Sequence, residues 1–348
     1  MCVRLIRLIF LARQCLLLGL ACAMLSGCGP SAPWRQESFV FGTRVELLIT
    51  GVPEAKALAA GSQVLAEFDR LHRTYHAWQP SALSALNAAI AAGKPMEVSP
   101  EFAGYIRQLQ QLAADSDYLF DPGIGRLIAL WGFHSDEFKT RLPDETALAA
   151  LTKQRPSIAD IQLDGLRVTS RNPAVALDFG GYLKGVALDR AAQILRTAGI
   201  HNALINIGGN VMALGTKNGV PWRVGIQHPR PATVGGAPLA SLELRDGEAL
   251  GTSGDYYRFF EINGRRYCHL LDPRTGYPAM GTQSVTILIP PGATAGMRSD
   301  VLSKPLFIAG DAWLRQASKL NVIAALKVGA GGTAIATPAM RSRLKMMP

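Results

Sequence analysis

The chain has 348 residues, of which 48% are hydrophobic and 18% charged, and its formal net charge is +10. Its basic residues are scattered singly, without the dense stripe and interleaved aromatic residues of a nucleic-acid-binding surface, so we expect no nucleic-acid partner. A mild attraction to anionic substrates or lipid headgroups is the more economical interpretation of the charge.

The first 27 residues have the layout of a secretory signal peptide. Arg4, Arg7 and Arg13 form a basic leader, an apolar core extends from Cys15 to Met24, and small residues follow. The apolar run is too short to span a bilayer comfortably. The junction Leu25-Ser26-Gly27-Cys28 resembles the bacterial lipoprotein processing site, where Cys28 is lipidated and becomes the new N-terminus. Cleavage without lipidation and an uncleaved anchor are the alternatives.

Removal of this leader would change both the charge and the cysteine content. The leader carries three arginines and no acidic residue, so the net charge falls to +7. If Cys28 is lipidated, only Cys268 remains, and no internal disulfide can form. Acyl chains on Cys28 would hold the protein on a membrane, with residues 28–34 as lipidated cysteine and tether. We therefore expect a cell-envelope protein, anchored to the inner (or outer) membrane and facing the periplasm.

The first half of the mature chain predicts mostly helices. Residues 39–49 indicate a strand with a break at Gly42, and residues 53–75 carry a helical stripe of apolar side chains. Ser99-Pro100-Glu101 is typical of a helix start, with an N-cap, a first-turn proline and an acid. A further short helix is expected from Asp144 to Leu151.

The second half predicts a helix followed by strands. A helix after Gly181 ends at Gly199, and Asn263-Gly264 predicts a tight hairpin. A late helix is expected over Asp300–Leu320. The expected strands are Ala203–Ile207, Trp222–Ile226, Leu242–Leu244, Tyr257–Ile262, Arg266–Leu271 and Ser284–Ile289. About 320 mature residues can form one large domain or two small ones. Without an obvious linker or repeat, we expect one compact α+β domain over residues 35–340.

The most informative stretch is LDFGGYLKGVALDRAAQILRTAGIHNALINIGGN, residues 177–210. Paired glycines let a backbone approach a ligand closely or adopt positive φ, and the exposed amides suit an anion such as a phosphate. The stretch matches neither the P-loop nor the dinucleotide fingerprint, so a plain strand-to-helix turn is the alternative. We interpret four of its residues as one wall of a site for a phosphorylated ligand: Asp178, Gly180, Gly181 and Lys184.

Further polar residues flank the expected hairpin. Ser253 precedes it, His269 and Asp272 follow it, and we expect the three to converge. His269 is the candidate general base because an imidazole titrates close to ambient pH. Asp300 either caps a helix or binds a hard divalent cation. The other histidines that we interpret as structural are His72, His134, His201 and His228.

Together these segments resemble the FAD:protein FMN transferases, a flavin-transferase family formerly labelled thiamine-biosynthesis lipoproteins. The resemblance extends from Phe41-Gly42-Thr43 to the Asp300 helix. Its most specific stretches are LDFGGYLKGVALDRA, NALINIGGN, TSGDYYRFF and HLLDPRTGYP, and FDPGIGRLIALWGF supports them. It implies a T-fold-like domain of mixed, mostly antiparallel strands with packed helices.

The resemblance also implies an activity. Family members bind FAD with Mg²⁺, move its FMN half onto a threonine hydroxyl of a target protein and release AMP. The targets are typically subunits of membrane redox complexes, which suits an exported protein on a lipid anchor. The alternative is an exported FAD-binding lipoprotein, or an FAD pyrophosphatase, without transferase activity.

Residue roles follow from the resemblance by position. Around the flavin or adenine it places Phe41, Tyr75, Phe120 and Asp121, with Tyr75 able to stack on a ring face. In contact with FAD it places Asp178, Gly180, Lys184 and Ser253, and in the ring pocket Leu271. His269 would take the threonine proton, with Asp272 as a second catalytic residue. The metal ligands would be the Gly181 carbonyl and the Asp300 carboxylate.

Three positions depart from the family's pattern. Phe41 stands where methionine is usual, and Asn210 where aspartate is usual. Lys304 replaces a threonine that completes the metal site, although an ammonium has no acceptor and cannot ligate Mg²⁺. The metal is then bound differently, or Lys304 partly replaces the cation, or catalysis has been lost.

Overall fold

The computed structural model describes residues 32–135, 140–231, 233 and 235–346. The expected signal peptide, Cys28 and most of the expected tether lie outside these residues. Across the part that is described, no helix combines the length and the apolar character needed to cross a membrane.

An eight-stranded antiparallel sheet forms the centre of the fold, in the order β1-β2-β6-β7-β10-β13-β14-β15. Phe41 and Gly42, with φ of 57° and 67°, form a two-residue turn between β1 and β2, so the interrupted strand expected there is a hairpin. The strand bounds are β1 Trp34–Val40, β2 Thr43–Ile49, β6 Ala203–Ile207, β7 Asn210–Leu214, β10 Ala249–Gly254, β13 Thr282–Ile289, β14 Ala324–Gly329 and β15 Ala334–Ala336.

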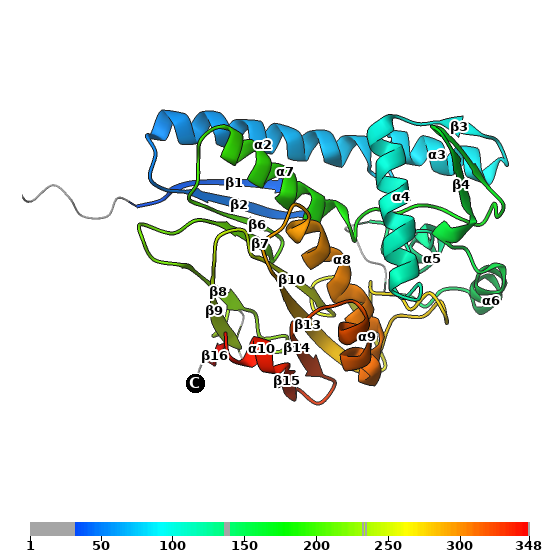
Figure 1. Ribbon diagram of the computed structural model, residues 1–348. Helices are drawn as coiled ribbons and strands as arrows, with labels where there is room; N and C mark the ends of the chain where they lie inside the picture. Colours follow the sequence, from blue (N-terminus) through cyan, green and yellow to red (C-terminus); the bar gives the residue numbers. More distant parts are fainter. Residues whose placement is uncertain (1–31, 136–139, 232, 234, 347–348) are drawn as a thin grey trace, which may run out of the picture.

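Helices cover one face of this sheet. Figure 1 shows α2 (Glu54–Thr74) along β1, and α7 (Leu183–Thr197) and α8 (Ala295–Ile308) beside each other over the middle strands; α9 (Trp313–Lys319) follows α8. The side chains between the helices and the sheet form the largest hydrophobic core, which includes Phe68, Leu188, Ile205 and Val285. Burial of this apolar area is the main stabilising contribution to the fold.

A small sheet covers the opposite face. It pairs β8 (Trp222–Ile226), β9 (Ala240–Leu244) and β16 (Lys345–Met346), and α10 (Pro338–Arg341) lies beside it. Strand alternation separates the two cores: in β10, Ala249 contributes to the helix-side core and Leu250 to the core under the small sheet.

The remaining elements extend beyond the end of the large sheet at which α7 begins (Figure 1). They are α3 (Ala82–Ala91), α4 (Pro100–Asp115), α5 (Gly125–Leu130), α6 (Glu145–Gln154), a 3₁₀ turn (Ile158–Asp160), and the sheet of β3 (Met96–Glu97), β5 (Arg167–Ser170) and β4 (Ile161–Asp164). The hairpin of β11 (Phe259–Ile262) and β12 (Arg265–Cys268) packs on α5 through an aromatic cluster that includes Trp131, Phe133 and Tyr267. The predicted α+β class with mostly antiparallel strands is confirmed.

Several local predictions are confirmed. Ser99 caps α4 by accepting a hydrogen bond from the Phe102 amide at 3.2 Å, and Asp144 caps α6. Asn263 and Gly264 form the β11–β12 turn.

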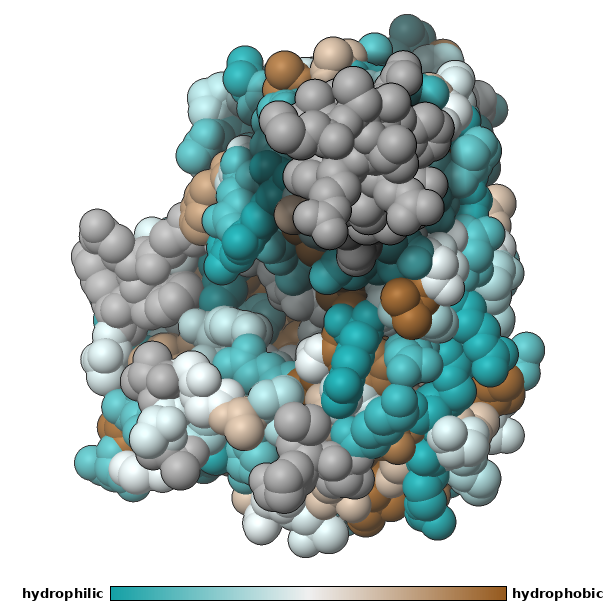
Figure 2. Space-filling view, turned by 90° about the vertical axis from the view of Figure 1, so that its left-hand side faces the viewer, coloured by the Kyte–Doolittle hydropathy of each residue, from teal (hydrophilic) through white to brown (hydrophobic). Residues whose placement is uncertain are grey.

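On the face seen in Figure 2, hydrophobic residues lie as separate spots among hydrophilic ones rather than as a continuous band.

The late helix differs from its prediction. It begins at Ala295, before Asp300, and ends at Ile308; a 3₁₀ turn (Gly310–Ala312) then separates it from α9. Asp300 is therefore inside α8, and the capping interpretation of this residue is wrong. The α8 N-terminus is instead held by Asp189 of α7, whose carboxylate accepts the amides of Gly296 and Met297 at 2.7 and 2.9 Å.

Candidate functional site

The close contact of α7 and α8 builds the site. A Cβ atom on Gly185 would lie 2.6 Å from the Gly296 carbonyl oxygen, and one on Gly296 would lie 2.6 Å from the Gly185 oxygen. The two glycines therefore let the helix backbones meet. This approach brings Asp300 under the first turn of α7, where its Oδ2 accepts the Gly185 amide at 3.0 Å.

Asp300 is the centre of a buried ionic cluster. Its Oδ1 lies 2.7 Å from Nζ of Lys304 and 3.6 Å from Nζ of Lys184. Lys304 also donates to the main-chain oxygen of Asp300 at 2.6 Å, and Lys184 donates to the Gly180 oxygen at 3.1 Å. The structure thus brings together Gly180, Lys184 and Asp300, which are up to 120 residues apart in the chain.

The charges in this cluster decide its protonation. Burial alone would raise the pKa of the Asp300 carboxyl, but the ammonium groups of Lys184 and Lys304, together with the Gly185 amide, outweigh it and hold that pKa below its ordinary value. Asp300 is therefore a carboxylate at neutral pH, paired with two ammonium groups.

Gly181 has no side chain because the Lys304 side chain lies directly against its backbone. A Cβ atom there would lie 2.8 Å from Cε of Lys304 and 3.3 Å from the ring of Phe120. Neither Gly180 nor Gly181 has a positive φ. The side chain of Lys304 thus crosses directly over Gly181 on its way to Asp300, with the buried Phe120 beside it.

The residues around Asp300 do not fit the Mg²⁺ ion that the resemblance implies, because the Lys304 side chain lies between Gly181 and Asp300. Both carboxylate oxygens and the main-chain oxygen of Asp300 already accept from protein donors. Ser303, one residue before Lys304, donates to that main-chain oxygen at 2.9 Å and bonds Ser253 at 2.7 Å. Within the described ranges, no group of three or more His, Cys, Asp or Glu side chains could hold a metal.

His269 follows β12 and is subject to the same charges. Its burial, then the charges of Arg258, Lys184 and Lys304, lower its pKa to about 3. Nδ1 lies 3.3 Å from the Arg258 carbonyl oxygen. Because a carbonyl only accepts, Nδ1 carries the proton and Nε2 keeps its lone pair. The expectation that His269 titrates close to ambient pH is therefore wrong: its imidazole is neutral at that pH, and in the field of the two lysines Nε2 can accept a proton only as a weak base.

Asp272 and Ser253 have other partners. The Asp272 carboxylate binds the Arg274 guanidinium, with Oδ2 2.7 Å from Nη2, and accepts the Arg274 amide at 2.9 Å. Ser253 is in β10 and bonds Ser303 of α8. The hairpin pairs β11 with β12, whereas β10, which carries Ser253, pairs with β13 and β7. The hairpin therefore does not bring Ser253 beside His269 and Asp272, as the sequence had predicted.

Asp178 holds the glycine turn. Its Oδ1 accepts the Gly180 amide at 2.7 Å, and its Oδ2 accepts Nε1 of Trp78 at 3.1 Å. The Trp78 ring lies 5.5 Å from that of His134. Trp78 was not predicted as a site residue, although it directly follows Tyr75-His76-Ala77, a segment that supports the family resemblance.

Two residues expected around the flavin or adenine, Tyr75 and Asp121, are buried and have partners within the protein. Tyr75 is 2% exposed, its hydroxyl donates to Glu101 at 2.8 Å, and its ring packs against Phe102, Tyr105 and Phe179, so it offers no free face to a ligand. The carboxylate of Asp121 is likewise occupied. It accepts the amides of Gly123 and Ile158 at 2.8 and 2.9 Å and the Ser157 hydroxyl at 2.5 Å.

The remaining apolar candidates lie at separate places. Phe41, at the β1–β2 turn, is half-buried with its ring 5.6 Å from that of His72. Leu271 is buried in the aromatic cluster with Trp131 and Phe133.

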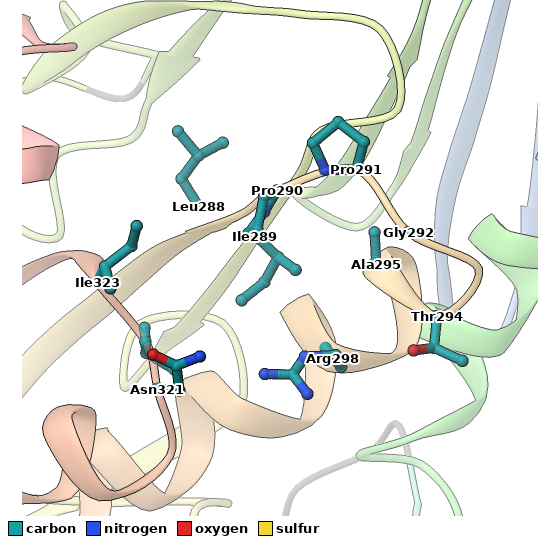
Figure 3. Close-up of a pocket in the computed structure, with 11 residues that line it drawn as sticks. Leu288, Ile289, Pro290, Pro291, Gly292, Thr294, Ala295, Arg298, Asn321 and Ile323 are labelled. Atoms are coloured by element: carbon teal, nitrogen blue, oxygen red, sulfur yellow. The ribbon is translucent and has the colours of Figure 1, made fainter.

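Two cavities lie outside this cluster. One, of about 330 Å³, lies under the small sheet, between Gly208-Gly209, Thr252 and Tyr256-Tyr257, and so joins two of the motifs. The other, of about 250 Å³, is lined by the end of β13, the start of α8 and Asn321–Ile323, and Arg298 points into it (Figure 3). Neither is lined by Asp300 or His269.

Comparisons with known proteins agree with this architecture. The ApbE family matches residues 41–326. An FAD:protein FMN transferase of Rhodobacter capsulatus is 43% identical over 90% of this chain, which spans 59% of that relative's length. A second, of Klebsiella pneumoniae, is 30% identical and covers 93% of this chain and 95% of its own.

Solved structures agree in fold. The apbe protein from Thermotoga maritima has a TM-score of 0.80 at 29% identity and covers 89% of this chain and 99% of its own. The flavin transferase ApbE from Vibrio cholerae has a TM-score of 0.77 at 24% identity and covers 90% and 100%.

Proposed function

The chain belongs to the ApbE family, and we propose from this premise that it is an FAD:protein FMN transferase acting on a threonine hydroxyl. The observation that supports the proposal is the pair of ammonium groups, Lys184 and Lys304, that Asp300 holds at the Gly180-Gly181 turn, with the neutral imidazole of His269 within range of their charges. A proton acceptor and a cationic pocket are what transfer of a phosphoryl group to a hydroxyl requires.

The reaction is a displacement at the FMN-side phosphorus of FAD. The threonine oxygen forms a new P–O bond, the bond to the bridging oxygen breaks, and AMP leaves with that oxygen. The threonine proton passes to Nε2 of His269. Phosphoryl transfer asks mainly for positioning and charge stabilisation from the protein, and Lys184 and Lys304 would supply positive charge to the diphosphate.

The residues around Asp300 do not fit the Mg²⁺ ion that the resemblance implies, so the proposed reaction includes no step on a metal. The acceptor we propose is a threonine-bearing subunit of a membrane redox complex. The leader and Cys28 support a lipoprotein at the cell envelope, on the same side of the membrane as that acceptor.

The test uses the full chain, FAD and a threonine-containing acceptor. We expect acceptor fluorescence in a denaturing gel and one AMP released per flavin attached. His269→Gln should lower the rate by about 10²- to 10⁴-fold, because general-base catalysis contributes that much. His201→Gln, at an exposed histidine, is the matched control and should leave the rate unchanged.

The alternatives give different results. AMP and free FMN without a labelled acceptor would identify an FAD pyrophosphatase, with water in place of threonine. FAD bound without any AMP released would identify a binding lipoprotein. Either result overturns the proposed transfer.

A further inference from the structure

Lys304 is a largely buried lysine that the fold accommodates specifically. It lies one helical turn after Asp300, and its side chain is 14% exposed. Its methylene groups pass over Gly181, where any side chain would collide with them. Burial of an ammonium is unfavourable unless it is paired and hydrogen-bonded, so this position needs an explanation.

The partners of Lys304 leave one donor unused. An ammonium has three N–H groups. Two of them donate to the main-chain oxygen and to Oδ1 of Asp300, at 2.6 and 2.7 Å. No third protein acceptor within hydrogen-bonding distance is found among the residues that the structure describes. The third N–H is available to a ligand.

The charge of the cluster is also incomplete. Asp300 contributes one negative charge, while Lys184 and Lys304 contribute two positive ones. Burial lowers the pKa of Lys304 to about 8, against the opposing effect of Asp300, so Lys304 is mostly an ammonium at neutral pH. His269, the nearby imidazole, is neutral. A buried excess of positive charge favours an anion at this place.

We propose that Lys304 is the resident cation of this site, and that its ammonium binds the diphosphate of FAD in place of a divalent metal. The inference rests on the proposed function for the identity of the ligand. It assigns the space between Asp300 and Gly181, where the resemblance expects Mg²⁺, to the Lys304 ammonium.

Three results should follow. FAD should bind the wild-type chain equally well in EDTA and in Mg²⁺. Lys304→Met, which keeps the packing over Gly181 but removes the charge, should weaken FAD binding by roughly 10- to 100-fold with no rescue by Mg²⁺. Lys304→Thr, which removes the ammonium and adds an oxygen ligand, should create a divalent site next to Asp300.

The measurements are FAD titration by fluorescence quenching and Mn²⁺ binding followed by electron paramagnetic resonance. The second readout is independent of activity: wild type should leave the free Mn²⁺ signal unchanged, and Lys304→Thr should reduce it. Lys327→Met is the matched control, because Lys327 is also buried and hydrogen-bonded, to the Gly310 oxygen at 2.7 Å, but lies in β14. It should leave FAD affinity unchanged.

Several outcomes overturn the inference: Mn²⁺ binding by the wild type at this site, tighter FAD binding in Mg²⁺, or a folded Lys304→Thr variant that binds no Mn²⁺. If Lys304→Thr does not fold, the FAD affinity of Lys304→Met decides. Transfer that requires Mg²⁺ would refute this inference and leave the proposed function standing. Metal-independent FAD binding that requires Lys304, without any transfer, would support this inference and refute the proposed function.

Discussion

Two buried carboxylates, Asp121 and Asp300, are 6% and 1% exposed, yet their surroundings differ in charge. Asp121 accepts two backbone amides and a serine hydroxyl, all neutral donors. Asp300 accepts one backbone amide and pairs with two ammonium groups. Burial raises the pKa of Asp121, whereas at Asp300 the two lysines and the Gly185 amide outweigh burial and lower the pKa.

The difference indicates how a carboxylate paired within the fold differs from the one in the proposed binding site. At Asp121 the hydrogen bonds come from its own loop and from the Ser157-Ile158 segment, and they engage both carboxylate oxygens. At Asp300 the neighbouring lysines bring more positive charge than the carboxylate neutralises. Burial alone does not distinguish Asp121 from Asp300, whereas the charge of their partners does.

The largest effect is expected from Asp300→Asn. It leaves Lys184 and Lys304 without a counter-charge, and removal of one partner from a buried pair costs about 3–5 kcal/mol of stability. The lysines should then move from their present positions, and transfer should fall by about 100-fold or more. Urea unfolding and the gel fluorescence assay measure the two effects. A stable variant with normal transfer would show that Asp300 is no more functional than Asp121.

Asp121→Ala is expected to act on stability alone. It leaves two buried amides and a hydroxyl without an acceptor, which should cost about 1–3 kcal/mol in urea unfolding. The folded variant should keep the wild-type FAD affinity, because both oxygens of Asp121 accept hydrogen bonds from the protein. A loss of FAD affinity in the folded variant would show that Asp121 contributes to the binding site.

The two acids should also respond oppositely to pH. The pKa of Asp300 is lowered on folding, so its contribution to stability is present above its ordinary value of 3.8 and is lost as the pH falls. The pKa of Asp121 is raised, so its contribution is present below 3.8 and is lost as the pH rises through the folded value. Asp300→Asn should therefore destabilise more at pH 6 than at pH 3, and Asp121→Asn more at pH 3. Urea unfolding at both values checks the signs, and equal effects at both would contradict the comparison.

The sequence predicted best what is encoded locally. Gly180 and Lys184 are one helical turn apart, and the structure joins them by a hydrogen bond. The sequence also predicted the N-caps at Ser99 and Asp144 and the turn at Asn263-Gly264. Helix caps and hairpin turns depend on a few adjacent residues.

Contacts between distant segments were not readable from local patterns. The buried position of Tyr75 depends on Phe102, Tyr105 and Phe179, and the start of α8 depends on Asp189 of α7. The position of Ser253 beside α8 depends on the pairing of β10 with β13. The link between Asp300 and the glycine turn came from the resemblance alone, since over 100 residues separate them.

Ser303→Ala should have the smallest effect of these substitutions. Ser303 lies next to Lys304, and its hydroxyl bonds the Asp300 main-chain oxygen and the Ser253 hydroxyl without adding charge. Its loss should cost about 1 kcal/mol, a melting-temperature decrease of about 2 °C, because neutral hydrogen bonds contribute on that scale. FAD affinity should not change, since both ammonium groups stay paired with Asp300. If Ser303→Ala weakens FAD binding as much as Lys304→Met, then packing around α8, and not the excess charge, distinguishes this site from Asp121.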